Sequence, residues 1–257
     1  MMLATILLPN YRTAELTRLC LRSLRMHSDF SKVRILAIDN ASEDESLDYL
    51  RSLPWITLIE RSRKEIEGMS PPVMHSSALD LALQQVDTPF VLSMHTDTIV
   101  HDPGWFDYLL EQFGESEKTA GVGSWKLETV PFWKVAGKSV EDAFRTLIGK
   151  HKKEFRFLRS HCAMYRTELL KKYTRGFDDG QCAGSSIHRH LLDAGYDMKF
   201  LPVSELSRYM AHLNHATMIL NPMRGHRTGS ARSFRELGGK MKAERYQKIL
   251  QDDSLDL

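Results

Sequence analysis

Short apolar runs recur along the first hundred residues and are separated by stretches with a different, helical spacing of hydrophobic positions. The runs are rich in Val, Ile and Leu, as in strands that are buried on both faces of a sheet. Three of them occupy residues 4–8, 33–39 and 55–60, and a fourth starts at Thr88-Pro89 and continues through FVLSM. We therefore expect four strands in this half of the chain.

The stretches between these runs have the pattern of amphipathic helices. Behind Thr13, a residue type that caps helices, hydrophobic residues recur three and four positions apart through residues 16–24. Ser42 and Glu45 have the spacing of a capping box, which predicts that a second helix opens at Ser42. A third helix is expected over residues 73–85.

The second half of the chain has a less regular pattern. Helices are expected at residues 102–113 and 138–158, and a strand at 120–127. Residues 161–173 read as a short strand that runs into a helix, and residues 185–202 as a helix, a glycine stop and a strand. Beyond about residue 221 the composition turns to Gly, Arg and Ser, with a final helix expected from about 233 to 250.

This order of strands and helices predicts an α/β fold with a mostly parallel central sheet flanked by helices. Parallel neighbours need a crossover connection, which is usually a helix. We expect one domain over residues 1–220, followed by an irregular basic C-terminal segment over residues 221–257 made of a closing loop and a helix.

The composition favours a globular protein of the cytoplasm. Hydrophobic residues make up 42% and charged residues 26% of the 257 positions, as in ordinary soluble domains. No apolar run approaches the roughly 20 residues that a bilayer crossing needs, and the start lacks the basic head of a signal peptide. Cys20, Cys162 and Cys182 form no C-x-x-C pair, which argues against a disulfide framework and a zinc knuckle.

The net charge of +2 hides an uneven distribution. Residues 1–130 carry 12 Lys and Arg against 19 Asp and Glu, whereas residues 131–257 carry 23 against 14. The basic residues concentrate at 150–160 and 224–245. Such patches suit phosphates, nucleic acid or anionic lipid, and the alternative is an ordinary solvated face.

Polar residues gather where three of the expected strands end. Pro9-Asn10-Tyr11 follows the first strand, Asp39-Asn40 the second, and His95-Thr96-Asp97 the fourth. In parallel sheets ligands bind beyond the carboxyl ends of the strands. The coincidence of three such clusters therefore predicts a binding site at this edge, with Asn10, Asn40 and Thr96 among its residues.

These blocks, in this order, resemble those of family 2 glycosyltransferases with the GT-A fold. The resemblance spans about residues 3–205 and rests on TILLPNYRTAELTRLCLRSL, ILAIDNASEDESLDYL, TPFVLSMHTDTIVHDPGW and the segment from GFDDG to LLDAGYDMKFLP. Its most specific parts are D-N-A-S-x-D at 39–44 and the acidic motif that ends at Asp97. It implies transfer of a sugar from a nucleotide-sugar donor, usually with inversion and with Mg²⁺ or Mn²⁺.

The resemblance also implies roles for individual residues. Pro9, Tyr11 and Glu15 would line the nucleotide pocket, and Asp39 would accept a hydrogen bond from the base of a UDP-, GDP- or dTDP-sugar. Asp97 would occupy the last position of the D-x-D motif, whose carboxylate reaches the metal at the donor diphosphate. A divalent cation stabilises the negative charge that develops there. The alternative for Asp97 is a strand-end cap.

The first position of that motif departs from the family, because it is His95 and the motif becomes H-x-D. Imidazole suits Mn²⁺ better than Mg²⁺, so we expect Mn²⁺ if a metal is used. The alternatives for His95 are a hydrogen bond near the diphosphate or a packed side chain. Related enzymes often place a histidine after the last core strand, and His212 fits that order. His95, Asp97 and His212 then form a possible three-ligand set.

A second departure concerns the general base. The acidic pair that the family places before its A-G-Y stretch falls here on Ala183-Gly184, and neither residue is a carboxylate. A base must take the proton of the acceptor hydroxyl. Asp179, which ends the G-F-D-D block, is the first candidate, followed by Asp178 and His188. The alternatives are a turn or cap for the aspartates and a surface position for His188.

The basic tail provides a last candidate. Arg224 and Arg227 would bind the donor diphosphate if the glycine-rich tail closes over it. An RNA- or lipid-binding arm and a disordered tail are the competing interpretations.

We expect a soluble sugar transferase that acts on a carbohydrate or lipid-linked acceptor in polysaccharide or glycolipid synthesis, with peripheral contact at the inner face of the membrane as an option. The main alternative is a non-catalytic relative that binds a nucleotide sugar or a partner. A nucleotidyltransferase is disfavoured because LLPNYRTAE has neither a Gly-rich loop nor a downstream lysine. Nucleic-acid binding is disfavoured because no known module is present.

Overall fold

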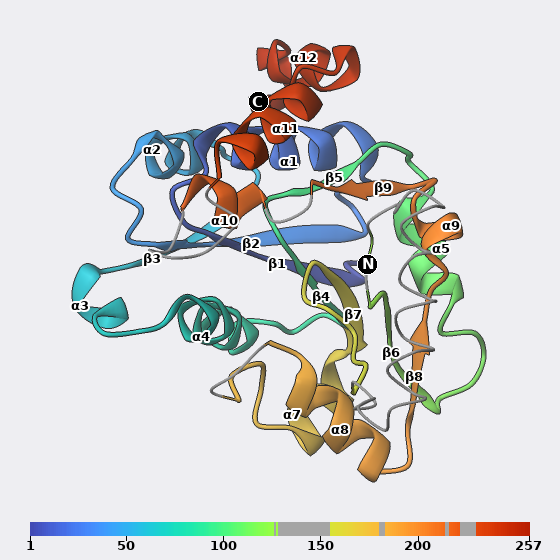
Figure 1. Ribbon diagram of the computed structural model, residues 1–257. Helices are drawn as coiled ribbons and strands as arrows, with labels where there is room; N and C mark the ends of the chain where they lie inside the picture. Colours follow the sequence, from blue (N-terminus) through green and yellow to red (C-terminus); the bar gives the residue numbers. More distant parts are fainter. Residues whose placement is uncertain (126, 128–154, 180–182, 214–215, 222–229) are drawn as a thin grey trace, which may run out of the picture.

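The computed structural model describes residues 1–125, 127, 155–179, 183–213, 216–221 and 230–257. Within these residues the main sheet has seven strands in the order β3-β2-β1-β4-β7-β6-β8 (Figure 1). The strands are β1 (Ala4–Asn10), β2 (Val33–Asn40), β3 (Thr57–Arg61), β4 (Phe90–Met94), β6 (Thr119–Gly123), β7 (Cys162–Arg166) and β8 (Asp197–Phe200).

The pairing of the strands confirms a mostly parallel sheet. β1 lies between β2 and β4 and is parallel to both, and β3 is parallel to β2. β7 is antiparallel to both of its neighbours, β4 and β6, while β8 is parallel to β6. The carboxyl ends of β1, β2, β4, β6 and β8 and the amino end of β7 therefore meet at one edge of the sheet.

Helices cover both faces because successive side chains of a buried strand point to opposite sides. In β1, Ile6 and Leu8 pack into the hydrophobic cluster that contains α1 (Ala14–His27), whereas Leu7 packs into the cluster on the opposite face. The helices of the second cluster are α4 (Pro71–Leu83), α7 (Thr167–Tyr173) and α8 (Ser185–Asp193). Alternating burial thus gives the three-layer α/β arrangement seen in Figure 1.

The expected helix starts differ from the observed ones in their caps. Helix α2 (Glu45–Ser52) is capped by Asp44, whose side chain accepts a hydrogen bond from the backbone N–H of Ser46. The prediction that Ser42 caps this helix is therefore wrong. Its hydroxyl instead donates to the Asp39 carboxylate at 2.5 Å, and its oxygen accepts from the backbone N–H of Arg12 and from Nδ2 of Asn10, each at 3.1 Å.

A second, two-stranded sheet lies beside the main one. It pairs β5 (Thr98–Val100) with β9 (Met210–His212) in antiparallel register, with Thr98 opposite His212. The short helices α3 (Arg63–Ile66), α5 (Trp105–Glu111), α9 (Val203–Leu206) and α10 (Ala216–Leu220) complete the chain up to residue 221. This pairing brings the chain after β9 close to the end of β4.

The C-terminal residues form two helices where one was expected. Helices α11 (Ala231–Met241) and α12 (Glu244–Leu250) are separated at Ala243, whose backbone is extended at ψ 132°. A 3₁₀ turn (Asp253–Asp256) follows, and the buried Arg22 of α1 donates to Asp253 at 2.6 Å. Buried side chains of α11 and α12 join the same hydrophobic cluster as α1.

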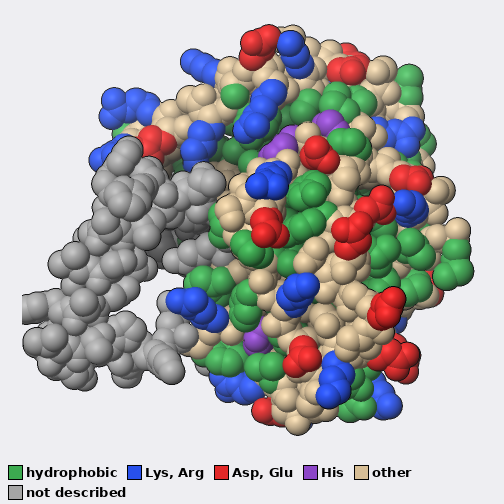
Figure 2. All heavy atoms as spheres, turned by 90° about the vertical axis from the view of Figure 1, so that its right-hand side faces the viewer, with side chains coloured by type: hydrophobic (Ala, Val, Ile, Leu, Met, Phe, Trp, Pro, Cys, Tyr) green, Lys and Arg blue, Asp and Glu red, His purple; other side chains and the backbone are tan. Residues whose placement is uncertain are grey.

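The expected basic patches at residues 150–160 and 224–245 lie partly outside the described residues. The helix expected over residues 138–158 lies mostly outside the described residues, and residues 155–158 are not helical. On the face drawn in Figure 2, acidic and basic side chains are interspersed with hydrophobic ones. None of the described helices combines the length and apolar character needed to cross a membrane.

Candidate metal and nucleotide site

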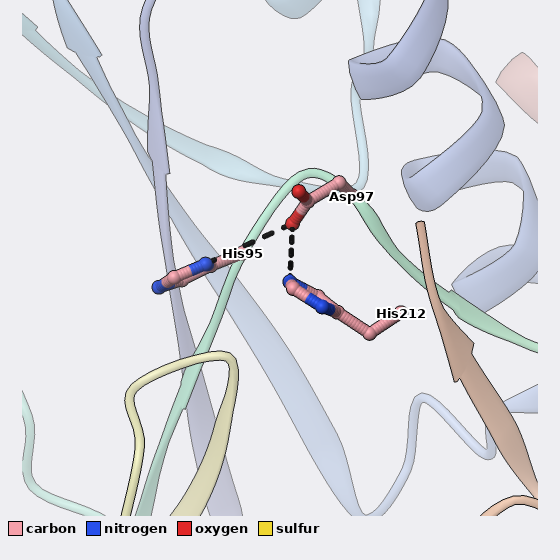
Figure 3. A group of neighbouring side chains, drawn as sticks. All are labelled: His95, Asp97 and His212. Carbon is pink, nitrogen blue, oxygen red and sulfur yellow. Dashed lines mark ion pairs between the residues drawn. The ribbon is translucent and has the colours of Figure 1, made fainter. Parts of the chain in front are cut away.

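Three side chains predicted as a ligand set converge at the end of β4 (Figure 3). A carboxylate oxygen of Asp97 lies 3.0 Å from Nε2 of His212 and 3.7 Å from Nδ1 of His95. One potential ligand atom from each residue lies within 4.8 Å of the others. Residues 95 and 212 are far apart in sequence, so the fold and not a local motif creates this group.

Backbone hydrogen bonds hold Asp97 in place from the C-terminal side. The N–H of Leu213 donates to the Asp97 carbonyl at 2.8 Å, next to the Thr98–His212 bridge. The N–H of Ala216, at the start of α10, donates to Oδ2 of Asp97 at 3.0 Å. Oδ2 is thereby bound to the backbone, and Oδ1 faces the two imidazoles.

Two further histidines, which the sequence did not single out, complete a cluster of four. His75 of α4 and His95 share the hydroxyl of Ser160, at 3.2 Å and 2.9 Å from their Nε2 atoms. His161 lies with its ring centroid 4.8 Å from that of His212, and its Nε2 lies 2.8 Å from the Ser124 hydroxyl. Ser160 thus fixes the ring of His95 so that Nδ1 faces Asp97, as outer hydrogen bonds commonly do for metal ligands.

Burial sets the charge of these groups. It lowers the pKa of His75 to about 4, although Asp97 acts in the opposite direction. Burial, together with His75, places the pKa of His95 well below its ordinary value. Burial raises the pKa of Asp97, but the charge of His212 and the hydrogen bond from it outweigh this effect, and the net pKa is low. At neutral pH His75 and His95 are neutral and Asp97 is ionised.

The donor set fits a divalent transition metal. Neutral imidazole nitrogens and one carboxylate oxygen suit Mn²⁺ or Zn²⁺, whereas Mg²⁺ prefers oxygen ligands alone. His95, Asp97 and His212 would hold the ion, with Ser160 and His75 behind His95.

The residues predicted for nucleotide binding at the ends of β1 and β2 form a buried polar network. Nδ2 of Asn10 lies 2.7 Å from Oδ1 of Asp39 and 2.8 Å from the hydroxyl of Ser46. Oδ1 of Asn10 accepts from the hydroxyls of Thr13 and Thr17 at 3.1 and 2.7 Å. Asn10 is 1% and Asp39 0% exposed, so much of their hydrogen-bonding capacity already serves the fold.

Asn40 lies beside this network and orders a buried arginine. Its Oδ1 accepts from Nη1 of Arg61 at 2.8 Å, and its Nδ2 donates to the carbonyl of Asn10 at 3.2 Å. Arg61 also donates to the carbonyl of Met74 in α4 at 3.1 Å. Burial lowers the pKa of Arg61, and it has no salt bridge among the described residues. No pattern in the sequence predicts that Arg61 is buried at this site.

The backbone is strained at the same place. Arg12, Ala41 and Glu43 are non-glycine residues with φ between 50° and 51°, in the left-handed region. The loops after β1 and β2 are linked here, because Arg12 donates from its backbone N–H to the Ser42 hydroxyl at 3.1 Å. Such strain persists only where the surrounding structure enforces it and is common at ligand sites.

The other predicted nucleotide residues lie around this network. Pro9 is buried in β1, Tyr11 is half-buried and Glu15 is exposed in the first turn of α1. Thr96 is buried, and its hydroxyl lies 3.3 Å from that of Thr13. Thr96 therefore connects the β1 loop with the H-x-D turn.

The three candidates for a general base occupy different surroundings. Oδ1 of Asp178 accepts from the hydroxyl of Ser76 at 3.0 Å, one residue from His75. Oδ2 of Asp179 accepts from the N–H of Ser186 in the first turn of α8 at 3.3 Å. His188 is buried between aromatic rings, apart from the histidine cluster. Asp178 is thus tied to the wall of the site, and Asp179 serves the start of α8.

The position where the family carries its acidic residue is closed to a side chain. Gly184 has φ 99°, and an added Cβ would lie 2.8 Å from the carbonyl oxygen of Leu158. The backbone conformation at Gly184 therefore leaves no room for a carboxylate side chain at this position. Arg224 and Arg227, predicted to bind the diphosphate, lie outside the described residues.

Solved structures with a similar fold include a mannosyltransferase. A mannosyltransferase, PcManGT from Pyrobaculum calidifontis in complex with GDP-Man and Mn²⁺, superposes with a TM-score of 0.56 at 18% identity, over 77% of this chain and 54% of its own. S. aureus TarS 1-349 in complex with UDP-GlcNAc gives 0.54 at 14% identity, over 97% and 70%. This chain thus spans about half of the mannosyltransferase, and these identities establish the fold alone.

The sequence itself carries a family signature. No curated protein matches this chain significantly. The profile of glycosyl transferase family 2, however, matches residues 5–174, which include the ends of β1, β2 and β4. This chain belongs to glycosyl transferase family 2.

Proposed function

We propose that this protein transfers a sugar from a nucleotide-sugar donor to a carbohydrate or lipid-linked acceptor, with inversion and with the help of a divalent metal. The observation that carries the proposal is the convergence of His95, Asp97 and His212 at the carboxyl edge of the sheet. Family membership supplies the reaction class. The similar mannosyltransferase binds GDP-Man and Mn²⁺, and TarS binds UDP-GlcNAc; these ligands support a nucleotide-sugar donor and a divalent metal in this protein too.

In the proposed reaction the loops after β1 and β2 bind the nucleoside, and the histidine cluster at the end of β4 lies at the diphosphate. The loops after β1 and β2 hold the nucleoside, with Tyr11 and Glu15 accessible beside the buried network. His95, Asp97 and His212 would hold a divalent ion, which would supply positive charge opposite the leaving diphosphate. Ser160 keeps His95 turned towards Asp97. Asp178, which accepts from the hydroxyl of Ser76, the residue after His75, is the described carboxylate that we favour as proton acceptor, since Asp179 bonds to the start of α8.

Mn²⁺ is the ion that we propose over Mg²⁺, because two of the three ligand atoms are imidazole nitrogens. The pKa of His95 lies below its ordinary value, so protons compete little for its lone pair at neutral pH. Location in the cytoplasm and peripheral contact with the inner face of the membrane remain part of the proposal.

Calorimetric titration with UDP, GDP, dTDP and CMP, in Mn²⁺, Mg²⁺ or EDTA, tests the function. We expect one diphosphate to bind in Mn²⁺, more weakly in Mg²⁺ and least in EDTA. Asp97→Ala should abolish the metal-dependent part, because it removes the central ligand. Asp107→Ala is the matched control, since this exposed carboxylate pairs with Lys32. Binding that ignores both metal and Asp97 would refute the metal-assisted transferase.

A specific observation favours the second candidate function, a non-catalytic protein that binds a nucleotide sugar. The backbone at Gly184 excludes the carboxylate that the family uses there. Donor hydrolysis or transfer separates the two functions, and we expect turnover that falls in Asp178→Asn. Metal-dependent binding with no turnover on any acceptor would establish the binding protein instead.

A further inference from the structure

Aromatic rings and arginines occupy the same edge of the sheet as the histidine cluster, on its β6–β8 side. β6 and β8 run parallel with Gly123 opposite Phe200, so Trp125 and Phe200 leave the sheet in the same direction. β7 is antiparallel to β4, with Cys162 opposite Met94. The segment 155–159 that leads into β7 therefore lies at the edge where β4 delivers His95 and Asp97.

The two arginines of this surface are stacked on rings. The guanidinium carbon of Arg159 lies 4.3 Å from the ring centroid of Trp125 and 5.0 Å from that of Phe157. That of Arg189 lies 4.9 Å from the centroid of Phe155. In the described part of the chain neither guanidinium has an ion pair or a side-chain hydrogen bond. Stacking occupies the face of a guanidinium and leaves its N–H edge for an oxyanion.

A histidine beneath these rings has an unused polar atom. His188 is 3% exposed, with its ring centroid 5.7 Å from Phe155 and 5.3 Å from Phe200. Its Nδ1 is buried without a hydrogen-bond partner. Both phenylalanines are 40% exposed, so their rings are accessible beside the two arginines.

Backbone and side-chain contacts connect this surface to the histidine cluster. The N–H of Arg159 donates to the carbonyl of Ser124 at 2.9 Å. The next residue, Ser160, lies between His75 and His95, and the hydroxyl of Ser124 bonds to His161. Arg159 and Trp125 are thus each one residue away from a serine of the cluster: Ser160 bonds to His75 and His95, and Ser124 bonds to His161.

We propose that Trp125, Phe155, Arg159, Arg189 and Phe200 bind the acceptor, and that this acceptor is a sugar that carries an oxyanion, either a phosphate or a carboxylate. The proposal rests on the proposed function. The β1–β2 loops lie on the opposite side of the H-x-D turn, which leaves this side for the second substrate. Sugar rings pack on exposed aromatic faces, and guanidinium edges bind the oxyanion in a two-point contact.

Tryptophan fluorescence gives a direct titration without donor or turnover, because Trp125 stacks against Arg159. The probes are glucose 1-phosphate, glucuronate, glucose and inorganic phosphate, with calorimetry as the second readout. We expect one of the two anionic sugars to bind at least about tenfold more tightly than glucose or phosphate alone. Preference between them identifies the oxyanion.

Arg159→Gln should weaken that binding at least about tenfold, and Arg159→Lys by less, because lysine keeps the charge but not the two-point contact. Arg232→Gln, in an exposed arginine of α11, is the matched control. Equal binding of glucose and the anionic sugars, or binding unaffected by Arg159→Gln in a folded variant, overturns the inference.

The two proposals fail in distinguishable ways. If a diphosphate binds through Asp97 but no anionic sugar binds through Arg159, the acceptor inference is wrong and the proposed function stands. If an anionic sugar binds through Arg159 but no diphosphate binds, the transferase is refuted and the acceptor role is refuted with it.

Discussion

Replacing Asn10 by aspartate would place two carboxylates side by side in a buried network. Nδ2 of Asn10 now lies 2.7 Å from Oδ1 of Asp39, and both side chains are buried. The substitution keeps the shape of the side chain and replaces a donor by an acceptor. It therefore tests whether this amide is required by the fold.

The distance sets the size of the effect. Two unit charges at this separation repel by about 6 kcal/mol at an effective dielectric constant of about 20. Taking up a proton at pH 7 on a carboxyl with an ordinary pKa of about 3.9 costs only about 4 kcal/mol. The folded variant is therefore expected to hold one proton between the two carboxyls. Because the unfolded chain releases that proton above about pH 4, the variant loses about 1.4 kcal/mol of unfolding free energy per pH unit between pH 5 and 7.

Urea denaturation of wild type and Asn10→Asp at pH 5, 6 and 7 measures this slope as the difference between the two proteins. Asn40→Asp is the matched control, since the same change at the neighbouring strand end gives the buried Arg61 a carboxylate 2.8 Å away. We expect it to cost less than about 1 kcal/mol and to lose no stability as the pH rises over this range.

A loss in Asn10→Asp that is equal at all three pH values would refute the reasoning, because it would mean that no proton is shared. Equal losses of unfolding free energy in Asn10→Asp and Asn40→Asp would also refute it, because the first carboxylate faces Asp39 and the second faces Arg61.

Two further predictions concern α8. Gly184→Ala should lower the unfolding free energy by about 2 to 3 kcal/mol, because φ is 99° and the Leu158 carbonyl obstructs Cβ; in urea titrations Gly195→Ala, with φ 86° and open space, should lose only about 1 kcal/mol, and equal losses would contradict the obstruction. Burial lowers the pKa of His188 to about 4, so the folded state binds its proton less readily than the unfolded state, and stability falls as the pH drops below about 6.5. Comparing His188→Leu with wild type between pH 8 and 5, we expect the variant to remove about 2 kcal/mol of that loss, and an unchanged pH profile would argue against a buried neutral imidazole.

Strands β1, β2 and β4 could be predicted because parallel strands buried on both faces are continuously apolar, and their polar ends mark one edge. The edge strand β3 was also predicted, although it is mostly exposed or half-buried. The error at Ser42 arose from a local rule. Ser42 and Glu45 have the spacing of a capping box, but the rule could not foresee that the Ser42 oxygen accepts from Arg12 and Asn10 and that Asp44 caps the helix. The break at Ala243 was missed because apolar positions continue at helical spacing on both sides of it.

Residues of the candidate site could be predicted from the sequence only where they follow a strand whose direction in the sheet is known. His95 and Asp97 follow β4, and the prediction that His212 joins them is consistent with the observed cluster. His75 lies inside α4, and no motif around it indicates a site. His161 precedes β7, which reaches the site with its first residue because it is antiparallel to β4. Sequence spacing carries no record of strand direction, so these two histidines could not be assigned.

The attachment of Asp97 to α10 has a consequence during synthesis of the chain. The amide that bonds to its carboxylate belongs to a residue 119 positions later, and His212 enters the cluster through β9. While the ribosome is still adding residues 98 to 211, His95 and Asp97 have no partner from β9 or α10. Domains fold as their segments emerge, so a nascent chain of this length has no complete ligand set, and a metal ion held by the three side chains would be bound only after Ala216 has been added.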